Sequence, residues 1–292
     1  MIRIGISFIL AMCMYSISWG DGPVDHPPAQ YDQKVFTEKM RISRGGQLYD
    51  NWWKTTDTGD KPGQNHPLWK LQNTNTRKGY STWRCKECHG WDYRGKEGAY
   101  GKGSHYTGFD GVYETSKTLP VKELINILNG STNKDHDFSR HLSDNDIADL
   151  ALFLKKGTID LAILLNSEGD YHAGRDFYRV NCMTECHGPE GMALNFGSEE
   201  KPQFIGSVAE KNPWEFIHKT RTGQPGTRMS SGIINEWTDD DFRNLLTYSR
   251  SLPKTAPEQG WLDRIKSIIG LGKEKENSIL QEHRGFGPKI DQ

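Results

Sequence analysis

The chain has 292 residues, with 37 lysines and arginines against 38 aspartates and glutamates. This balance, without a long basic run, excludes a dedicated nucleic-acid-binding protein, and the length allows two small domains. Only 34% of the residues are hydrophobic, so two such domains have little apolar surface of their own from which to build cores.

The N-terminus predicts an export signal. Arg3 precedes an apolar run that ends near residue 17, and small residues follow this run. The run is too short for a comfortable membrane span, whereas small residues at this distance suit signal-peptidase cleavage. We therefore expect residues 1–20 to be a cleaved signal peptide. An uncleaved anchor is one alternative, and a lipoprotein signal at Cys13 is another, which the bulky residue before this cysteine disfavours.

Cys85, Cys88 and His89 form the most informative motif of the chain. Two cysteines separated by two residues and followed directly by histidine are what covalent haem attachment requires. Each thiol adds to one vinyl group of the haem, and the histidine reaches the iron from one side. The alternative is a zinc site, which needs a second matching pair of ligands.

A second, altered copy of this motif lies at Cys182, Cys186 and His187, with three residues between the cysteines. The extra residue requires a bulge if both thioethers form. A disulfide between the two cysteines is the alternative, because exported thiols oxidise. The two motifs together predict two covalently bound haem c groups, with His89 and His187 as iron ligands.

Other elements of the chain also repeat. A glycine, a large apolar residue and a tyrosine precede each motif, and each half predicts a middle helix and a capped last helix. The paired elements are Gly45–Tyr49 and Gly174–Tyr178, the middle helices 121–128 and 213–219, and the last helices, which start at the caps Ser143 and Thr238 and end near Gly157 and before Pro253.

Three segments stand outside the repeat. Residues 50–84 are rich in Trp, Gly, Pro and Asn without helical periodicity, which predicts an insertion folded as a loop over the first haem. Residues 158–172 are predicted to link the halves, and residues 254–292 form a tail. The tail contains an amphipathic segment, 261–269, which we expect to pack on its own protein rather than on a membrane or a partner.

Each half resembles a class I c-type cytochrome, over about residues 40–157 and 173–253. In that family a helix with a glycine and an aromatic residue crosses the last helix beside the haem. The resemblance implies an all-α fold of two tandem class I cytochrome c domains. The first would span residues 21–157, including an N-terminal extension and the insertion, and the second residues 173–253.

The resemblance also implies the second axial ligands of the irons. Met229 stands in the loop before the last helix, where the family places its methionine. The first half has no methionine between Cys88 and Met183, and His136 occupies the corresponding place. His105, in an earlier loop, is the alternative, because bacterial dihaem peroxidases have a distal histidine after a similar interval.

The function implied by this resemblance is periplasmic transfer of single electrons between a donor and an acceptor redox protein. Two six-coordinate irons favour an electron carrier over a catalyst, so no catalytic residue is predicted. A dihaem peroxidase and a thiosulfate dehydrogenase-like enzyme are alternatives, and the second is disfavoured because no cysteine is left as a distal ligand. A cytochrome subunit of a larger oxidoreductase is a third.

Overall fold

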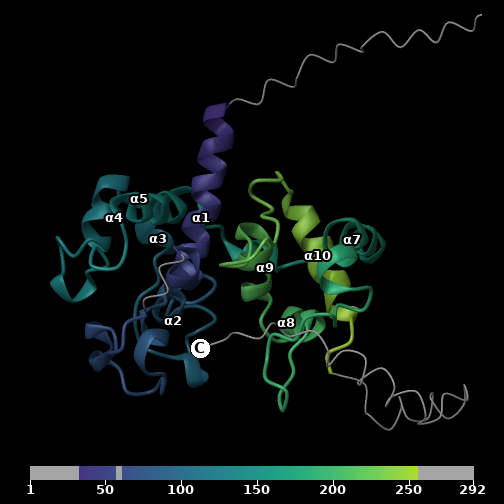
Figure 1. The fold of residues 1–292 in the computed structure, drawn as a ribbon, viewed down its shortest axis with the longest axis horizontal. Coiled ribbons are helices and arrows are strands. Elements are labelled where there is room, and N and C mark those ends of the chain that lie inside the picture. Colours follow the sequence, from purple (N-terminus) through teal and green to yellow (C-terminus); the bar gives the residue numbers. More distant parts are fainter. Residues whose placement is uncertain (1–32, 57–60, 256–292) are drawn as a thin grey trace, which may run out of the picture.

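The structure, a computed structural model, describes residues 33–56 and 61–255, which form helices and loops without a β-strand (Figure 1). The all-α class expected from the sequence is thereby confirmed. The predicted signal peptide, residues 1–20, and the predicted tail helix, residues 261–269, lie outside the described residues. Within the described ranges, no helix combines the length and the apolar character needed to cross a membrane.

The helices follow one another in two series. The first series is α1 Gln33–Thr55, η1 Pro67–Leu71, η2 Gly79–Trp83, α2 Cys85–His89, η3 Gly103–His105, α3 Tyr113–Thr118, α4 Val121–Leu128, η4 Lys134–His136, α5 Asp144–Leu152 and η5 Phe153–Gly157. The second is α6 Leu161–Leu164, α7 Tyr171–Tyr178, η6 Arg179–His187, α8 Ile205–Lys211, α9 Pro213–Thr222 and α10 Asp239–Ser251. We call residues 33–157 the N-terminal part and residues 158–255 the C-terminal part.

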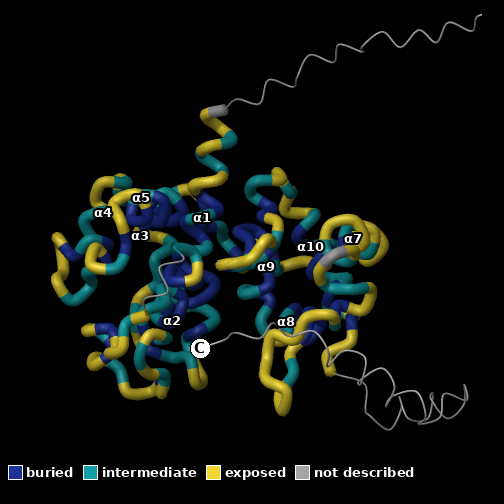
Figure 2. Tube along the Cα trace, in the orientation of Figure 1, coloured by how far each residue is buried: buried dark blue, intermediate teal, exposed yellow. Residues whose placement is uncertain are grey.

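Helix α1 lies between the two parts. Figure 1 shows α2 to α5 on one side of α1 and α7 to α10 on the other, and α1 contacts both α5 and α9. The buried residues follow these contacts, along α1, α5, α9 and α10, whereas the first turns of α1 are mostly exposed (Figure 2). The position of α1 makes it the element through which the two parts meet.

A glycine brings the first helix of each part against the last one. A Cβ atom on Gly45 would lie 2.1 Å from the carbonyl oxygen of Asp149 in α5. A Cβ atom on Gly174 would lie 2.0 Å from the carbonyl oxygen of Asn244 in α10. No larger residue fits at either crossing, so the repeated glycine has the same packing role in both parts.

The helix starts expected from the sequence are confirmed. Ser143 caps α5 and Thr238 caps α10. In each case the aspartate carboxylate three residues later accepts a hydrogen bond from the backbone N–H of the capping residue. Pro213 occupies the first turn of α9, where its missing N–H costs no hydrogen bond.

The structure contains helical residues within two of the predicted segments, 50–84 and 158–172. Helix α1 reaches Thr55, inside the expected loop insertion, across a kink at Asn51, whose φ of −158° and ψ of 85° are not helical. Trp52 and Trp53 are 1% and 4% exposed, and their burial binds the turn after the kink to the core. Aromatic burial here outweighs the lack of helical periodicity. The expected linker, residues 158–172, contains α6, whose Leu161 and Leu164 are buried.

Candidate haem sites

Helix α2 presents the first cysteine–histidine segment. Its α-helical turn places Cys85 and Cys88, three residues apart, on one side of the helix. The helix ends at Gly90, whose backbone N–H donates to the carbonyl of Lys86 at 3.0 Å and whose φ of 78° favours glycine. Burial raises the pKa of the Cys85 thiol to about 12, so this thiol is neutral at pH 7.

Cys85, Cys88 and His89 line a cavity of about 340 Å³ in the N-terminal part. Most of its other walls are apolar, and they come from several elements of the N-terminal part. From the insertion comes Trp83, and from α4 comes Leu124. The loop before α3 adds Phe109 and Val112, the loop before α5 adds Phe138, and η5 adds Leu154. An apolar cavity with two thiols and a histidine on its wall fits a covalently attached porphyrin.

The ring of His89 is held in the orientation that ligation needs. Its Nδ1–H donates to the carbonyl oxygen of Asp110 at 2.7 Å, which leaves the lone pair on Nε2. Burial lowers the pKa of His89 to about 4, so the ring is neutral at pH 7.

His136 lines the same cavity and has the same tautomer. Its Nδ1–H donates to the carbonyl oxygen of Ile127 at 3.2 Å, and its Nε2 stays free. The ring centres of His89 and His136 lie 6.4 Å apart. Imidazole nitrogen binds a metal such as zinc at about 2.0–2.1 Å, so two imidazoles on opposite sides of one metal ion have ring centres roughly 6.3 Å apart. The observed spacing therefore suits an iron between them.

His66 also lines this cavity, and no site role was predicted for it. The backbone N–H of Leu68 donates to its Nδ1 at 3.2 Å, so the neutral ring has its proton on Nε2 and offers no lone pair there. This Nε2 has no hydrogen-bond partner, although the side chain is only 5% exposed. A buried donor without an acceptor, in a cavity of this lining, fits a bound group with acceptor oxygens, such as the propionates of haem. The sequence around His66, a histidine before a proline, is too common to have predicted this role.

His105, the alternative distal ligand, lies elsewhere. Its ring stacks on Tyr100 with 4.6 Å between ring centres, and it lines a different cavity. Of the two candidates that the sequence left open, His136 is the one placed in the cavity of His89.

The second cysteine–histidine segment lies on η6, which is a π-helix. Here the N–H of Gly188 donates to the carbonyl of Met183 at 3.0 Å, five residues back, whereas the corresponding bond of Gly90 in the first segment spans four residues. The wider turn absorbs the extra residue between Cys182 and Cys186. Gly188, with a φ of 70°, ends the segment as Gly90 ends the first.

A tyrosine braces each segment from the preceding helix. The hydroxyl of Tyr49 donates to the carbonyl of Gly90 at 2.6 Å, and the hydroxyl of Tyr178 donates to the carbonyl of Gly188 at 2.8 Å. The repeated tyrosine therefore makes the same hydrogen bond in both parts.

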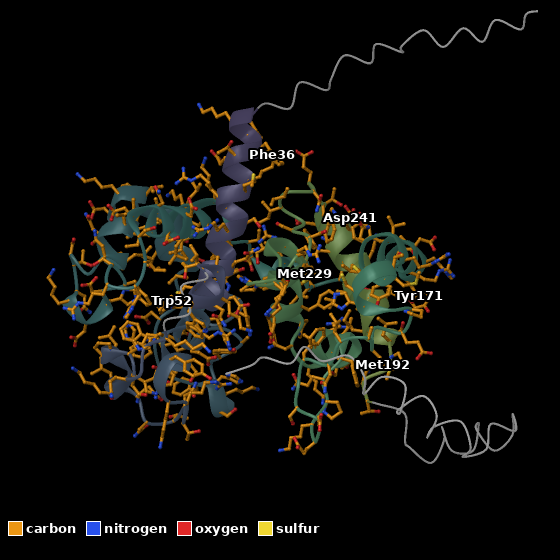
Figure 3. All side chains as sticks on the ribbon, viewed as in Figure 1. Phe36, Trp52, Tyr171, Met192, Met229 and Asp241 are labelled. Carbon is orange, nitrogen blue, oxygen red and sulfur yellow. The ribbon has the colours of Figure 1, made fainter. Side chains whose placement is uncertain are left out.

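The second segment is more open than the first. Cys186 is exposed, and burial raises the pKa of Cys182 to about 12. His187 is half-buried, and its Nδ1 has no hydrogen-bond partner among the described residues. Met229 is half-buried in the loop between α9 and α10, and Figure 3 shows it beside α9. The structure thus places Cys182, Cys186 and His187 together on η6, and Met229 in the separate loop between α9 and α10.

Comparison with known proteins gives one result. The family model described as cytochrome C oxidase, cbb3-type, subunit III, matches residues 169–248, from the start of α7 into α10. No curated protein and no solved structure matches the chain. The match supports a c-type cytochrome domain in the C-terminal part. Such a domain implies covalently bound haem c and electron transfer with redox partners, and domains of this kind are typically exported.

Proposed function

We propose that the protein is an exported, periplasmic dihaem c-type cytochrome, built from two class I cytochrome c domains, that transfers single electrons between redox proteins. The observation that carries this proposal is the repeated geometry around the two cysteine–histidine segments. The glycine crossing, the tyrosine brace and the terminal glycine recur in the N-terminal part, outside the stretch that the family model matches.

Each residue of the two sites has a distinct role in this proposal. The four motif cysteines would attach the haems, and His89 and His187 would each bind one iron. His136 completes the first site and Met229 the second. Bound haem supplies one-electron chemistry, and the protein holds the ligands and keeps water from the first site with its apolar walls. A thioether ligand favours ferrous iron more than an imidazole does, so the second site has the higher potential.

The way His136 is held favours a carrier over an enzyme. Its Nδ1 is bonded to Ile127, and its ring packs against Phe138 and His66 at 5.2 and 5.8 Å between ring centres. A ligand fixed in this way leaves no open coordination position for a substrate. A peroxidase requires a distal ligand that can leave, which this packing opposes. Because the matching family is described as an oxidase subunit, a cytochrome subunit of a larger oxidoreductase is the second candidate.

The test combines mass spectrometry with electron paramagnetic resonance of the exported ferric protein. We expect a mature chain that begins at residue 21 and has the added mass of two haems, and two low-spin signals. Replacing His136 with alanine should convert one signal to high spin, because the first iron loses an axial ligand. His105→Ala is the matched control and should leave both signals unchanged.

Two outcomes contradict the proposal. A mature protein with one haem or none removes the dihaem assignment. A high-spin signal in the unmodified ferric protein indicates an open coordination position and favours an enzyme.

A further inference from the structure

A second cavity, of about 240 Å³, lies between the two parts, away from the cavity of His89 and His136. Lys86, Tyr100 and His105 line it from the N-terminal part, and Lys211, Asn212 and Glu215 line it from the C-terminal part. The first group surrounds α2 and the second belongs to the end of α8 and the start of α9, which face α2 in Figure 1.

Two buried polar atoms of this cavity have no hydrogen-bond partner. The Tyr100 side chain is only 6% exposed, yet its hydroxyl is unpaired. The Nδ1 atom of His105 also has no hydrogen-bond partner: Oε2 of Glu87 lies 3.8 Å away, within the range of an ion pair but too distant for a hydrogen bond. Buried polar atoms nearly always have partners, so two unpaired ones in one cavity point to a bound polar group.

The charges around the cavity favour an anion. Arg77 and Lys86 both pair with Glu87, behind the wall, so their charges are partly compensated. Glu215 pairs with Lys219 at 3.7 Å. Lys211 lines the cavity and has no ion-pair partner among the described residues. A cation, a hydroxyl and an imidazole on the wall of one cavity form a set of donors that suits negatively charged oxygens.

The volume limits the size of the ligand. Pockets for organic ligands are usually about 300–1,000 Å³, and this cavity is smaller. We propose that the cavity binds a small inorganic oxyanion of the size of sulfate or phosphate, held by Tyr100, His105 and Lys211.

The position of this site links it to the first cysteine–histidine segment. Lys86 lies between Cys85 and Cys88, so a bound anion sits on the other side of α2 from the haem cavity. If the proposed function holds, the anion stabilises the ferric state of the first haem relative to the ferrous state. By reciprocity, reduction of that haem then weakens anion binding.

The test uses isothermal titration calorimetry of the full haem-loaded protein with sulfate and with phosphate, at constant ionic strength. We expect saturable binding at one site. Tyr100→Phe and Lys211→Gln should each weaken it about tenfold, because each removes one charge-assisted contact. Tyr80→Phe and Lys122→Gln make the same chemical changes at residues outside the cavity and should leave the affinity unchanged. Since the Tyr100 hydroxyl has no protein partner, its removal breaks no internal hydrogen bond.

Absence of saturable binding of either anion means that the cavity holds water alone, and it overturns the site. If the Tyr100→Phe and Lys211→Gln variants bind the anion as tightly as the unmodified protein, the anion is bound elsewhere and the proposed site is wrong. The redox link has its own readout, the midpoint potentials measured with and without sulfate. Binding without a change in either potential overturns the link to the first haem. The haem count from mass spectrometry, which tests the proposed function, does not depend on the anion affinities or on the potentials.

Discussion

Two tyrosine hydroxyls fix the ends of the cysteine–histidine segments. Tyr49 and Tyr178 are both 1% exposed, and each donates to the carbonyl of the glycine that follows the motif histidine. The bond joins the first helix of each part to the turn that orients His89 or His187. At this scale, one hydroxyl positions a motif histidine through the backbone of the next residue.

We expect Tyr49→Phe and Tyr178→Phe each to lower the free energy of unfolding by about 0.5–1.5 kcal/mol, the usual net value of one internal hydrogen bond. Tyr100→Phe is the matched control, because it removes a buried hydroxyl that has no protein partner. That variant should be neutral in the absence of added oxyanion. Denaturant titrations of the three variants measure the difference, and equal losses in all three mean that the braces do not contribute.

The sequence specified the residues whose chemistry depends on spacing alone. Cys85, Cys88 and His89 were predicted because covalent attachment fixes their separation. The choice between His136 and His105 stayed open, because it depends on which ring the fold brings to His89. The role of His66 depends on a backbone N–H that fixes its tautomer. Such hydrogen bonds leave no trace in the sequence.

At the scale of elements, two helix crossings define the frame around the segments. Gly45 in α1 meets α5, and Gly174 in α7 meets α10, with no room for a Cβ atom in either place. Each crossing fixes the helix that carries the tyrosine bonded to the cysteine–histidine segment. The packing of the helices and the position of the segment therefore both depend on one glycine.

Gly45→Ala and Gly174→Ala should each destabilise the protein. Alanine is favoured over glycine in a helix by about 1 kcal/mol, but a Cβ atom 2.0–2.1 Å from a carbonyl oxygen forces the helices apart. Overpacking of this kind costs about 1–3 kcal/mol, occasionally more, so the net change is a loss. Gly63→Ala is the control, because nothing lies within 4 Å of its added Cβ. Thermal unfolding measures the three variants, and a raised melting temperature for Gly174→Ala contradicts the crossing.

The sequence predicted the elements that have strong local signals. The caps Ser143 and Thr238 and the proline at the start of α9 mark their helices correctly, because capping and proline geometry act within one turn. The extension of α1 through Trp52 and the helix α6 were not predicted. Both depend on burial against distant residues, which a local pattern does not contain.

At the scale of the whole molecule, one turn of α9 binds the two parts together. His218 of α9 is fully buried against the N-terminal part: its Nε2–H donates to the Gly46 carbonyl at 3.0 Å, and its Nδ1 accepts from the Tyr93 hydroxyl at 2.8 Å. The carbonyl of Thr222 accepts from Ser43 at 2.8 Å. These contacts join α9 to α1 and to the loop after α2, so they hold the two parts together.

A buried carboxylate completes this junction. Asp50 of α1 is 1% exposed and pairs with Lys219 of α9 at 2.8 Å and with Arg84 just before α2. Burial alone would raise the pKa of Asp50, but Lys219 and Arg84 outweigh it and hold this pKa well below its ordinary value of 3.8. A lowered pKa means that the stabilisation is complete above pH 3.8 and is lost as the pH falls towards the folded-state pKa.

Asp50→Asn should therefore lower the free energy of unfolding at pH 7 by about 3 kcal/mol, the lower end of the cost of breaking a buried pair, because it takes the buried carboxylate away from two half-buried cations. The difference from the unmodified protein should shrink as the pH falls below 3.8, since the unmodified carboxyl then loses its own advantage. Asp176→Asn, which removes one member of an exposed pair with Arg175, is the control and should change stability by less than about 1 kcal/mol at either pH. Denaturant titrations of the haem-loaded proteins at pH 7 and in the acid range measure both effects. A difference that stays constant with pH would show that the charge of Asp50 does not hold the two parts together.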